Sequence, residues 1–556
     1  MGRPPGIRAG RAAGVVLAAA AAIAMAPASA AAWEAPVTLS PGTPADEGPL
    51  LAVDAAGDAV VAWGRGAPTT EDEGPPRAWR VEASTRPPGA PAWSAPQRLS
   101  PAGELGFDVA VAMLPTGVPV VTWTTMRRGI ADVTRGEARG EPSGWVTTPL
   151  DIVSGAWSQR ATAAGPDGTL AVATTSPWWI RGSWLRLQVR EPGGTWREPP
   201  LLPVRLEHLA VAALPGGRVV VAWLEQQGEQ GSPDARTLVV TREWDPTSGW
   251  RDPERGDDLA GAAHDFRLAA TADGSLLAVV VLRHERGSDV VAAARSPGGA
   301  WAAPQVLAGS DAGNVRLTVS PDGSAAAAWD DAGDTRVSTW RPGRGWSPVE
   351  TPPPGACVRP RQLESIAMGP SGELLVVGSA GWMSDFHHGY IRAWTRGADG
   401  PWVGPVWLSR PVAGNAVAAI DGSGRMHVAW SRASAAGVVR TQVTSTDPAG
   451  AGTGVVRGDP VAAVTRLTVS GRGATSLAVR FRLSQPGRVV VQLQRAAPAY
   501  GLGRRITAIG RRGANSVLVR LGGTDPVRPG RYVVVVWSEA GVVSGCAVHS
   551  RALVIR

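Results

Sequence analysis

The chain contains 556 residues, of which 44% are hydrophobic and 18% charged. This composition supplies enough apolar material for a folded core, and the length allows several domains or one large repeat body with an extra module. All 55 basic residues are Arg, a bias that GC-rich coding produces by itself, so the net charge of +8 does not argue for a nucleic-acid partner. Two cysteines, Cys357 and Cys546, exclude a disulfide framework, and neither lies in a Cys/His spacing typical of a metal site.

The first 30 residues have the pattern of a secretory signal peptide. Three arginines lie among the first eleven residues, residues 15–25 are apolar, and residues 28–30 read Ala-Ser-Ala, a small-residue cleavage site. We therefore expect this segment to be removed and the protein to be secreted, with retention at the cell surface left open. The alternative is an uncleaved anchor helix. No later segment is long and apolar enough in sequence to cross a membrane.

The sequence then repeats a hairpin signature, in which a turn glycine precedes an apolar run that ends in Trp six residues later. A turn sequence such as residues 165–168, Gly-Pro-Asp-Gly, is typical of hairpins, because Gly adopts the positive φ that the turn requires. The full signature occurs at Gly57/Trp63, Gly117/Trp123, Gly217/Trp223, Gly323/Trp329 and Gly424/Trp430. The turns at Gly168, Gly274 and Gly372 keep the pattern without the Trp. The runs beside each turn have the length and composition of strands.

A second signature, Trp followed three residues later by Pro, predicts a strand at a sheet edge, because Pro donates no hydrogen bond to a ladder. It occurs at Trp33, Trp93, Trp196, Trp250, Trp301 and Trp402, and Trp145 and Trp346 occupy the same place with Pro at another offset. Between the two signatures lies a further strand, such as residues 183–190. The signatures alternate, and the turn glycines recur about every 52 residues, which predicts a four-stranded antiparallel unit.

Eight such units predict an all-β fold, an eight-bladed β-propeller with four-stranded blades over residues 31–446. The last unit lacks its Trp-x-x-Pro strand, whereas the chain begins with an unpaired one at residues 33–39. We expect this N-terminal strand to complete the last blade, because ring closure removes an open sheet edge. The alternatives are a seven-bladed ring with one irregular unit and an open β-solenoid.

Beyond the repeats, residues 447–460 are rich in Gly, Ala and Asp/Pro and are typical of a linker. Residues 461–556 contain roughly seven alternating strands and resemble the immunoglobulin-like or fibronectin type III-like sandwiches of many secreted bacterial proteins. Residues 455–556 carry 16 Arg against three acidic residues. This basic module is a candidate for attachment to an anionic surface such as a cell-wall polymer or lipid headgroups. Because the whole chain carries only +8, the rest of it is net negative. The alternatives are a solvated surface of biased composition and docking on this acidic propeller.

Two groups of residues that no repeat position explains are candidate binding sites, and both fall on the loop face where propellers carry function. The first lies in the third blade and comprises Trp157, Arg160, Trp178 and Trp179. Exposed Trp beside Arg suits stacking on a sugar or a peptide. The alternative is packing within the loops.

The second group lies in the seventh blade and comprises Trp382, Asp385, His387, His388 and Tyr390. Adjacent histidines point apart on a strand, so they do not readily ligate one metal ion. The interpretations are a polar binding loop, ordinary surface or, least favoured, a metal site. We expect no metal and no other cofactor.

A ring of polar residues is a third candidate. The residue nine positions before each turn glycine begins the first strand of its blade, near the mouth of the channel, and six of the eight are polar. These are Asp108, Gln159, His208, Asp265, Asn314 and Asn415. They form either a ligand- or ion-binding ring or a solvated rim.

The Trp-and-turn repeat over about residues 33–446 resembles the sialidase-like propellers of secreted bacterial proteins. The resemblance implies an arginine cluster for a substrate carboxylate, a Tyr nucleophile with an acidic partner, and an acid/base Asp. This sequence departs from that pattern. Tyr390 is the only Tyr of the propeller and has no Glu beside it, and residues 320–323 lack the residue expected between Asp and Gly in the family's Asp-box turns.

The sequence contains no Gly-rich phosphate loop, serine nucleophile elbow or zinc helix. We therefore expect a monomeric extracellular binding protein that holds a glycan, a cell-wall polymer or another protein on the loop face. The alternative is a secreted glycoside hydrolase or lyase of the sialidase-like propeller type, which needs paired carboxylates. Carboxylates or arginines that converge at the top of the propeller would favour the enzyme, and aromatic side chains there would favour binding.

Overall fold

A computed structural model describes residues 33–446 and 464–555 with internal gaps, and every regular element in these residues is a β-strand. The gaps are residues 41, 43–44, 67–79, 102–103, 128–131, 142–143, 155–158, 176–182, 193, 205–207, 228–234, 286, 354–361, 381–389, 410–412, 434–437, 472–475, 485, 496–501, 522–526, 528–529, 541–542, 545–547 and 550–552. Within the described ranges, no helix is long and apolar enough to cross a membrane.

Residues 33–446 form a series of antiparallel sheets of four or five strands each. The first four sheets are β2–β5 (Ala45–Val53, Ala59–Gly66, Arg80–Arg86, Gln97–Arg98), β6–β9 (Glu104–Met113, Pro119–Arg127, Asp132–Glu141, Gly144–Ser154), β10–β14 (Gln159–Ala164, Leu170–Thr175, Ser183–Arg190, Trp196–Arg197, Leu202–Val204) and β15–β19 (Leu209–Ala213, Val219–Gln227, Arg236–Asp245, Gly249–Trp250, Glu254–Ala260). The next four are β20–β23 (Ala262–Ala270, Leu276–His284, Gly287–Arg295, Gln305–Ser310), β24–β27 (Ala312–Val319, Ala325–Asp331, Asp334–Arg341, Gly345–Trp346), β28–β31 (Gln362–Met368, Leu374–Ala380, Tyr390–Arg396, Trp402–Trp407) and β32–β34 (Ala413–Ile420, Met426–Ala433, Val439–Ser445) with β1 (Val37–Thr38).

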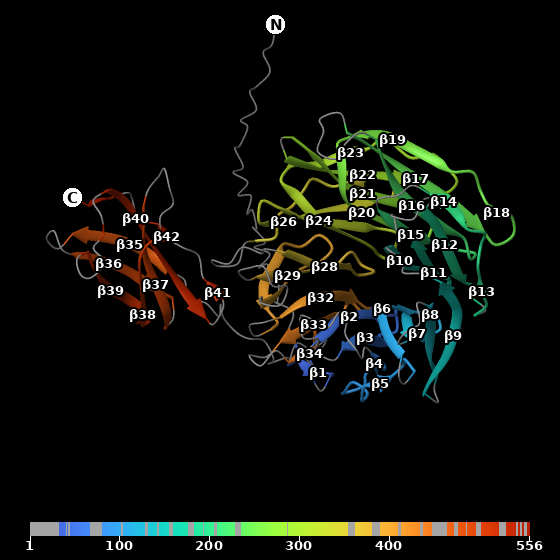
Figure 1. Ribbon diagram of the computed structural model, residues 1–556, viewed down its shortest axis with the longest axis horizontal. Coiled ribbons are helices and arrows are strands. Elements are labelled where there is room, and N and C mark those ends of the chain that lie inside the picture. The colour runs from blue at the N-terminus through green and yellow to red at the C-terminus, as the bar shows by residue number, and fades with distance from the viewer. Residues whose placement is uncertain are drawn as a thin grey trace, which may run out of the picture. The chain divides into compact units, whose positions relative to one another are not determined.

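The series of sheets returns to its start, which makes the fold propeller-like. The first strand of each sheet contacts the first strand of the next, and β32 of the last sheet contacts β2 of the first. In Figure 1 the blue strands of the first sheet lie between the orange strands of the last and the cyan strands of the second. The N-terminal strand β1 pairs with β34 of the last sheet, with Val37 opposite Val443, and Trp33 bridges to Thr446.

The Trp residues of the hairpin signature are buried between neighbouring sheets. Trp123 is fully buried and packs against Val60 and Val81 of the preceding sheet. A Cβ at Gly136 would lie 2.3 Å from the Trp123 ring, so glycine on β8 is what leaves room for the indole. Burial of such a large apolar side chain stabilises the contact between sheets.

Two Trp residues of the Trp-x-x-Pro signature, Trp196 and Trp402, belong to a second kind of contact between sheets. Glu350 follows the fourth strand of one sheet and accepts hydrogen bonds from Arg396 Nη1 (2.5 Å) and Trp402 Nε1 (2.8 Å) of the next. Glu137 likewise accepts hydrogen bonds from Arg190 Nε and from Trp196 Nε1 of the next sheet. The carboxylate, the guanidinium and the indole therefore form a clamp across the sheet boundary.

Residues 464–555 form two sheets with one core. The three-stranded sheet comprises β35 (Val464–Gly471), β36 (Ser476–Leu483) and β39 (Gly513–Arg520). The other comprises β37 (Gly487–Arg495), β38 (Leu502–Gly510), β40 (Gly530–Ala540), β41 (Val543–Ser544), β42 (Val548–His549) and β43 (Leu553–Ile555). Alternate residues of both sheets, such as Phe481 and Val534, are buried in the shared core.

Candidate functional site

Charged and polar side chains gather where the first strands of three neighbouring sheets begin. We call these six half-buried residues the rim cluster, and they are Asp265 and Arg267 on β20, Asn314 and Arg316 on β24, Asp330 on β25 and Glu364 on β28. In Figure 1, β20, β24 and β28 lie on one side of the centre of the sheet series.

Strand bulges explain why polar residues occupy the beginnings of these first strands. The pairing register of β24 shifts between Gly313 and Arg316, and that of β32 shifts between Gly414 and Val417. Asn314 and Asn415 lie inside these bulges with φ of 51° and 53°, a left-handed conformation that Asn tolerates better than apolar residues do.

A bulge also leaves a backbone N–H group without a partner in the ladder. A carboxylate of the preceding sheet accepts the hydrogen bond of this N–H group. The pairs are Asp265 Oδ2 with Val315 N (2.9 Å), Asp330 Oδ2 with Leu363 N (2.9 Å) and Glu364 with Ala416 N. The same device therefore joins three consecutive pairs of sheets at the rim.

Hydrogen bonds to neighbouring acceptors hold two guanidinium groups of the rim cluster in place. Arg267 Nη1 donates to Asp265 Oδ1 (2.6 Å) and to the carbonyl of Phe266 (2.8 Å). Arg316 Nε donates to the carbonyl of Glu364 (3.0 Å), and its Nη1 donates to a backbone carbonyl (3.2 Å). No hydrogen bond within the described residues engages the Nη2 group of either arginine. Burial, and then repulsion by Arg267, lowers the pKa of Arg316. An anion placed between the two cations would relieve that repulsion.

Burial governs the carboxyl groups beside these arginines. It raises the pKa of Asp330 to about 6, although the Leu363 amide and Asn314 Nδ2 (3.0 Å) both favour the ionised form. Burial also raises the pKa of Glu364. The site therefore presents two guanidinium cations, of which Arg267 is ion-paired with Asp265, beside two carboxyl groups, Asp330 and Glu364, that bind protons more readily than usual.

The carboxyl groups of the rim cluster make contacts between neighbouring sheets. Both oxygens of Asp330 already accept hydrogen bonds from the next sheet, which commits the carboxylate to a structural contact. Among the described residues, no group of three or more His, Cys, Asp and Glu could hold a metal ion. Among the described residues, the Nη2 groups of Arg267 and Arg316 remain as the groups that can contact a ligand.

Most residues of the two predicted groups lie outside the described residues; these are Trp157, Trp178, Trp179, Trp382, Asp385, His387 and His388. Arg160 is described, and its Nη2 donates to Thr122 Oγ1 of the preceding sheet (3.0 Å). Tyr390 is buried at the start of β30, with its ring edge-on to Trp407 at 5.3 Å. Tyr390 is therefore an interior residue and not part of a surface loop.

The structure places two of the six predicted ring residues, Asp265 and Asn314, in the rim cluster. Asp108 and Gln159 begin or lie within first strands, and only their backbone is described. His208 is half-buried, and its carbonyl accepts the amide of Leu224 (3.2 Å).

Asn415, another predicted ring residue, packs against the first sheet. A Cβ atom at Gly48 of that sheet would lie 2.6 Å from the Cβ atom of Asn415.

Sequence reasoning missed Arg267, Arg316, Asp330 and Glu364. Both arginines stand seven residues before a turn glycine, where the other six units have a small or apolar residue. The comparison of each strand position across the repeats, beyond the single position nine before the glycine, would have found them.

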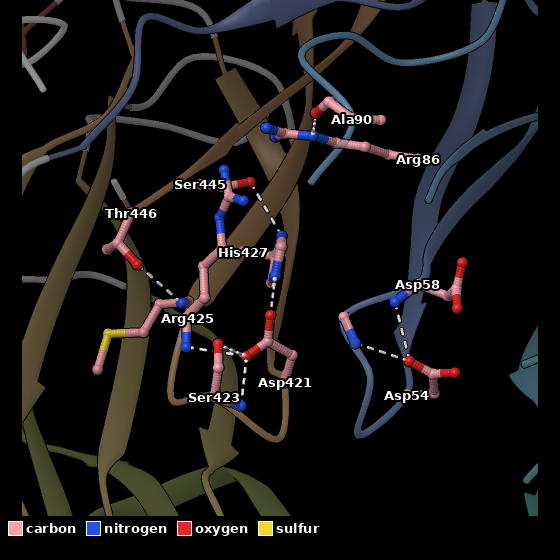
Figure 2. A network of polar contacts seen from close by, with 12 residues as sticks. Asp54, Asp58, Arg86, Ala90, Asp421, Ser423, Arg425, His427, Ser445 and Thr446 are labelled. Carbon is pink, nitrogen blue, oxygen red and sulfur yellow. Dashed lines mark hydrogen bonds and ion pairs between the residues drawn. The ribbon is translucent and has the colours of Figure 1, made fainter. Parts of the chain in front are cut away.

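A second polar cluster lies where the last sheet meets the first (Figure 2). His427 Nδ1 is 2.9 Å from Ser445 Oγ, and His427 Nε2 is 3.3 Å from Asp421 Oδ2. The residue types match a hydrolase triad, but the exposed fractions are 0% for Ser445, 1% for His427 and 4% for Asp421. No substrate reaches a buried hydroxyl of this kind, so the cluster is structural.

The geometry of this second cluster fixes its charges. Burial lowers the pKa of His427 and so favours the neutral ring. Burial opposes the ionisation of Asp421, yet hydrogen bonds from His427, Ser423 and the Arg425 amide hold its pKa at about 2. An ionised Asp421 therefore links the β32–β33 turn to His427, and His427 in turn contacts Ser445 on β34.

No family model matches the sequence, and no curated protein matches it. Among solved structures, a fungal alcohol oxidase of the AA5 family is 14% identical with a TM-score of 0.39, over 81% of this chain and 98% of that one. The Hadza microbial sialidase Hz136 is 14% identical with a TM-score of 0.33, over 51% and 63%. An α-L-arabinofuranosidase from Fusarium graminearum is 12% identical with a TM-score of 0.31, over 54% and 91%. Likenesses at this level assign neither a family nor an activity.

Proposed function

We propose that the chain is an extracellular binding protein whose rim cluster holds an anionic ligand, a glycan, cell-wall polymer or protein segment that carries carboxylate groups. The observation that carries the proposal is the pair Arg267 and Arg316, whose Nη2 groups make no hydrogen bond within the described residues. A guanidinium fork fits a planar carboxylate and binds it with two parallel hydrogen bonds.

The raised pKa of Asp330 and that of Glu364 support an anion at this place. A protonated carboxyl does not repel an anion. Because the pKa of Asp330 is about 6, the ligand should bind more tightly as the pH falls from 7 to 5.

The test uses oligogalacturonate as the probe and the full chain as the protein, with affinity measured by calorimetry. Arg267→Gln/Arg316→Gln should weaken binding at least about tenfold, because two charge-assisted contacts are lost. The matched control is Arg98→Gln/Arg344→Gln, which removes the same charge from exposed positions elsewhere and should leave the affinity within about twofold. Equal weakening by both pairs, or none by the rim pair, contradicts the proposal.

We also propose an eight-bladed ring over residues 31–446, a linker at 447–460 and an immunoglobulin-like sandwich at 461–556 as an attachment module. The closed series of sheets and the pairing of β1 with β34 support the ring. Two sheets around one core support the sandwich. The N-terminal pattern supports removal of residues 1–30 and secretion, and we propose a monomer.

A second candidate function is that of a glycoside hydrolase or lyase, and one observation favours it. Asp330 and Glu364 interact electrostatically, and each has a raised pKa, as a general acid requires. We expect oligogalacturonate to be bound and recovered intact. Release of reducing ends by the wild type, abolished in both Asp330→Asn and Glu364→Gln, would replace the binding function with catalysis.

A further inference from the structure

The outer face of the three-stranded sheet β35–β36–β39 carries arginines. Arg480 and Arg482 are exposed alternate residues of β36, while Phe481 and Leu483 point into the core. Arg466 is exposed at the bulge of β35 with a φ of 54°, between the partners of Arg480 and Arg482. Three guanidinium groups therefore share one face.

Short side chains surround the central arginines on this face. Arg480 lies between Thr468 of β35 and Ser516 of β39, and Arg482 lies between Thr465 and Ala514. None of these neighbours reaches as far as an arginine. The guanidinium groups of Arg480 and Arg482 therefore protrude beyond their neighbours, and the Thr and Ser hydroxyl groups lie beside them on the same face.

The turn that leads into β39 adds two arginines at the end of the same face. Arg511 and Arg512 are exposed, and the next residue, Gly513, pairs with Leu483 beside Arg482. Asn515 Oδ1 accepts the amide of Arg511 (2.9 Å), and its Nδ2 donates to the Arg511 carbonyl (2.7 Å). The Asn515 side chain thus fixes the turn that presents the two arginines. We call Arg466, Arg480, Arg482, Arg511 and Arg512 the arginine face.

Within the described residues, no acidic side chain neutralises the arginine face. Residues 460–524 contain neither Asp nor Glu, although they contain eleven arginines. In the part of the chain that the structure describes, no ion pair engages any of the five arginines of the face. Like charges held close together repel, and a bound polyanion would relieve the repulsion and release its counterions.

We propose that the arginine face binds a linear polymer of phosphodiester-linked polyols. Side chains at alternate positions of a strand are about 7 Å apart, which suits consecutive charges along an extended chain. The guanidinium fork matches phosphate oxygens, and the Thr and Ser hydroxyls suit polyol groups. The described exposed residues of this sheet include no aromatic side chain of the kind that enters a lipid interface, which favours a polymer over a membrane. The inference deepens the proposed attachment role and does not depend on the rim cluster.

The test measures binding of the full chain to immobilised poly(glycerol phosphate) over a range of salt concentrations. Arg480→Gln/Arg482→Gln should weaken binding at least about tenfold and reduce the slope of log affinity against log salt concentration by about two. The matched control is Arg488→Gln/Arg531→Gln, which removes two exposed arginines from β37 and β40 of the other sheet and should change the affinity less than about twofold. An unchanged melting temperature shows that the variants are folded, because all four side chains are exposed.

Three results would overturn the inference. These are equal weakening by both pairs, absence of polymer binding by the wild type, and binding to phosphatidylglycerol vesicles without binding to the polymer. The last result would assign the face to a membrane. The rim variant Arg267→Gln/Arg316→Gln should keep full polymer binding, so failure of the rim proposal and failure of this inference are distinguishable.

Discussion

Asp330 experiences two opposing influences in the rim cluster. The amide of Leu363 and the side-chain N–H of Asn314 favour its ionised form, whereas burial favours the protonated form. Burial prevails and raises the pKa from 3.8 to about 6. Between these two pH values the folded protein keeps a proton that the unfolded chain has lost, so ionisation of Asp330 destabilises the fold as the pH rises.

Asp330→Asn should therefore change how stability depends on pH. The wild type should lose at most ~3 kcal/mol relative to the variant as the pH rises from about 4 to about 6, and the difference should be constant above about pH 7. Urea unfolding at pH 4, 5, 6 and 7.5 measures this difference. His427, whose pKa burial lowers, contributes equally to both proteins and cancels. Parallel profiles for the two proteins would contradict the assignment of a raised pKa to Asp330.

Among the strands, the short outer ones need more than backbone pairing. Strands β13, β18 and β27 are each two residues long, so few ladder hydrogen bonds hold them. The clamp supplies a further contact, since Glu137 receives Arg190 Nε at 3.0 Å as well as the indole of Trp196. Arg190 is 2% exposed and Glu137 is 5% exposed, so water does not replace a lost partner.

Glu137→Gln should destabilise the protein by about 3 kcal/mol, because it leaves the buried Arg190 without a counter-charge. The midpoint of urea unfolding measures the loss. The matched control is Asp399→Asn, which breaks the corresponding pair with Arg341 at 3.2 Å, where Asp399 is 85% exposed. The control should change stability by less than about 1 kcal/mol. If both substitutions have the same effect, the buried clamp does not stabilise the boundary between sheets.

The elements differ in how far the sequence predicts them. Hairpins and their buried Trp follow from local patterns, and the antiparallel sheets appear where the glycine turns predict them. The clamps are not predictable in this way, because Glu137 and Arg190 are 53 residues apart and many acidic residues could serve as the partner. The bulge at Asn314 is equally hidden, since a shift of one residue leaves the apolar pattern almost unchanged. The repeat pattern predicts Asp265 and Asn314 near the rim, but their contacts across the sheets depend on these bulges and emerged only from the structure.

At the scale of the whole repeat body, one short strand joins the two ends of the sheet series. Thr38 of β1 pairs with Gln442 of β34, and Gln442 Nε2 donates to Thr38 Oγ1 (3.1 Å) across 404 positions of sequence. Glu34 adds ion pairs to Arg86 of the first sheet and to Arg425 of the last. The closure contacts therefore hold the first and last sheets together and cover the edge of β34.

A covalent bond at this place should stabilise the repeat body as a unit. We expect Thr38→Cys/Gln442→Cys, in a background with Cys357 and Cys546 replaced by Ser, to form a disulfide, because the two positions are directly paired and their side chains already meet. Closing so long a loop restricts the unfolded chain and should raise the free energy of unfolding by about 4 kcal/mol. The measurement is the urea midpoint with and without reductant, and Thr38→Ser/Gln442→Ser in the same background is the control. If the oxidised variant unfolds at the control's midpoint, unfolding of the repeat body does not require the two ends to separate.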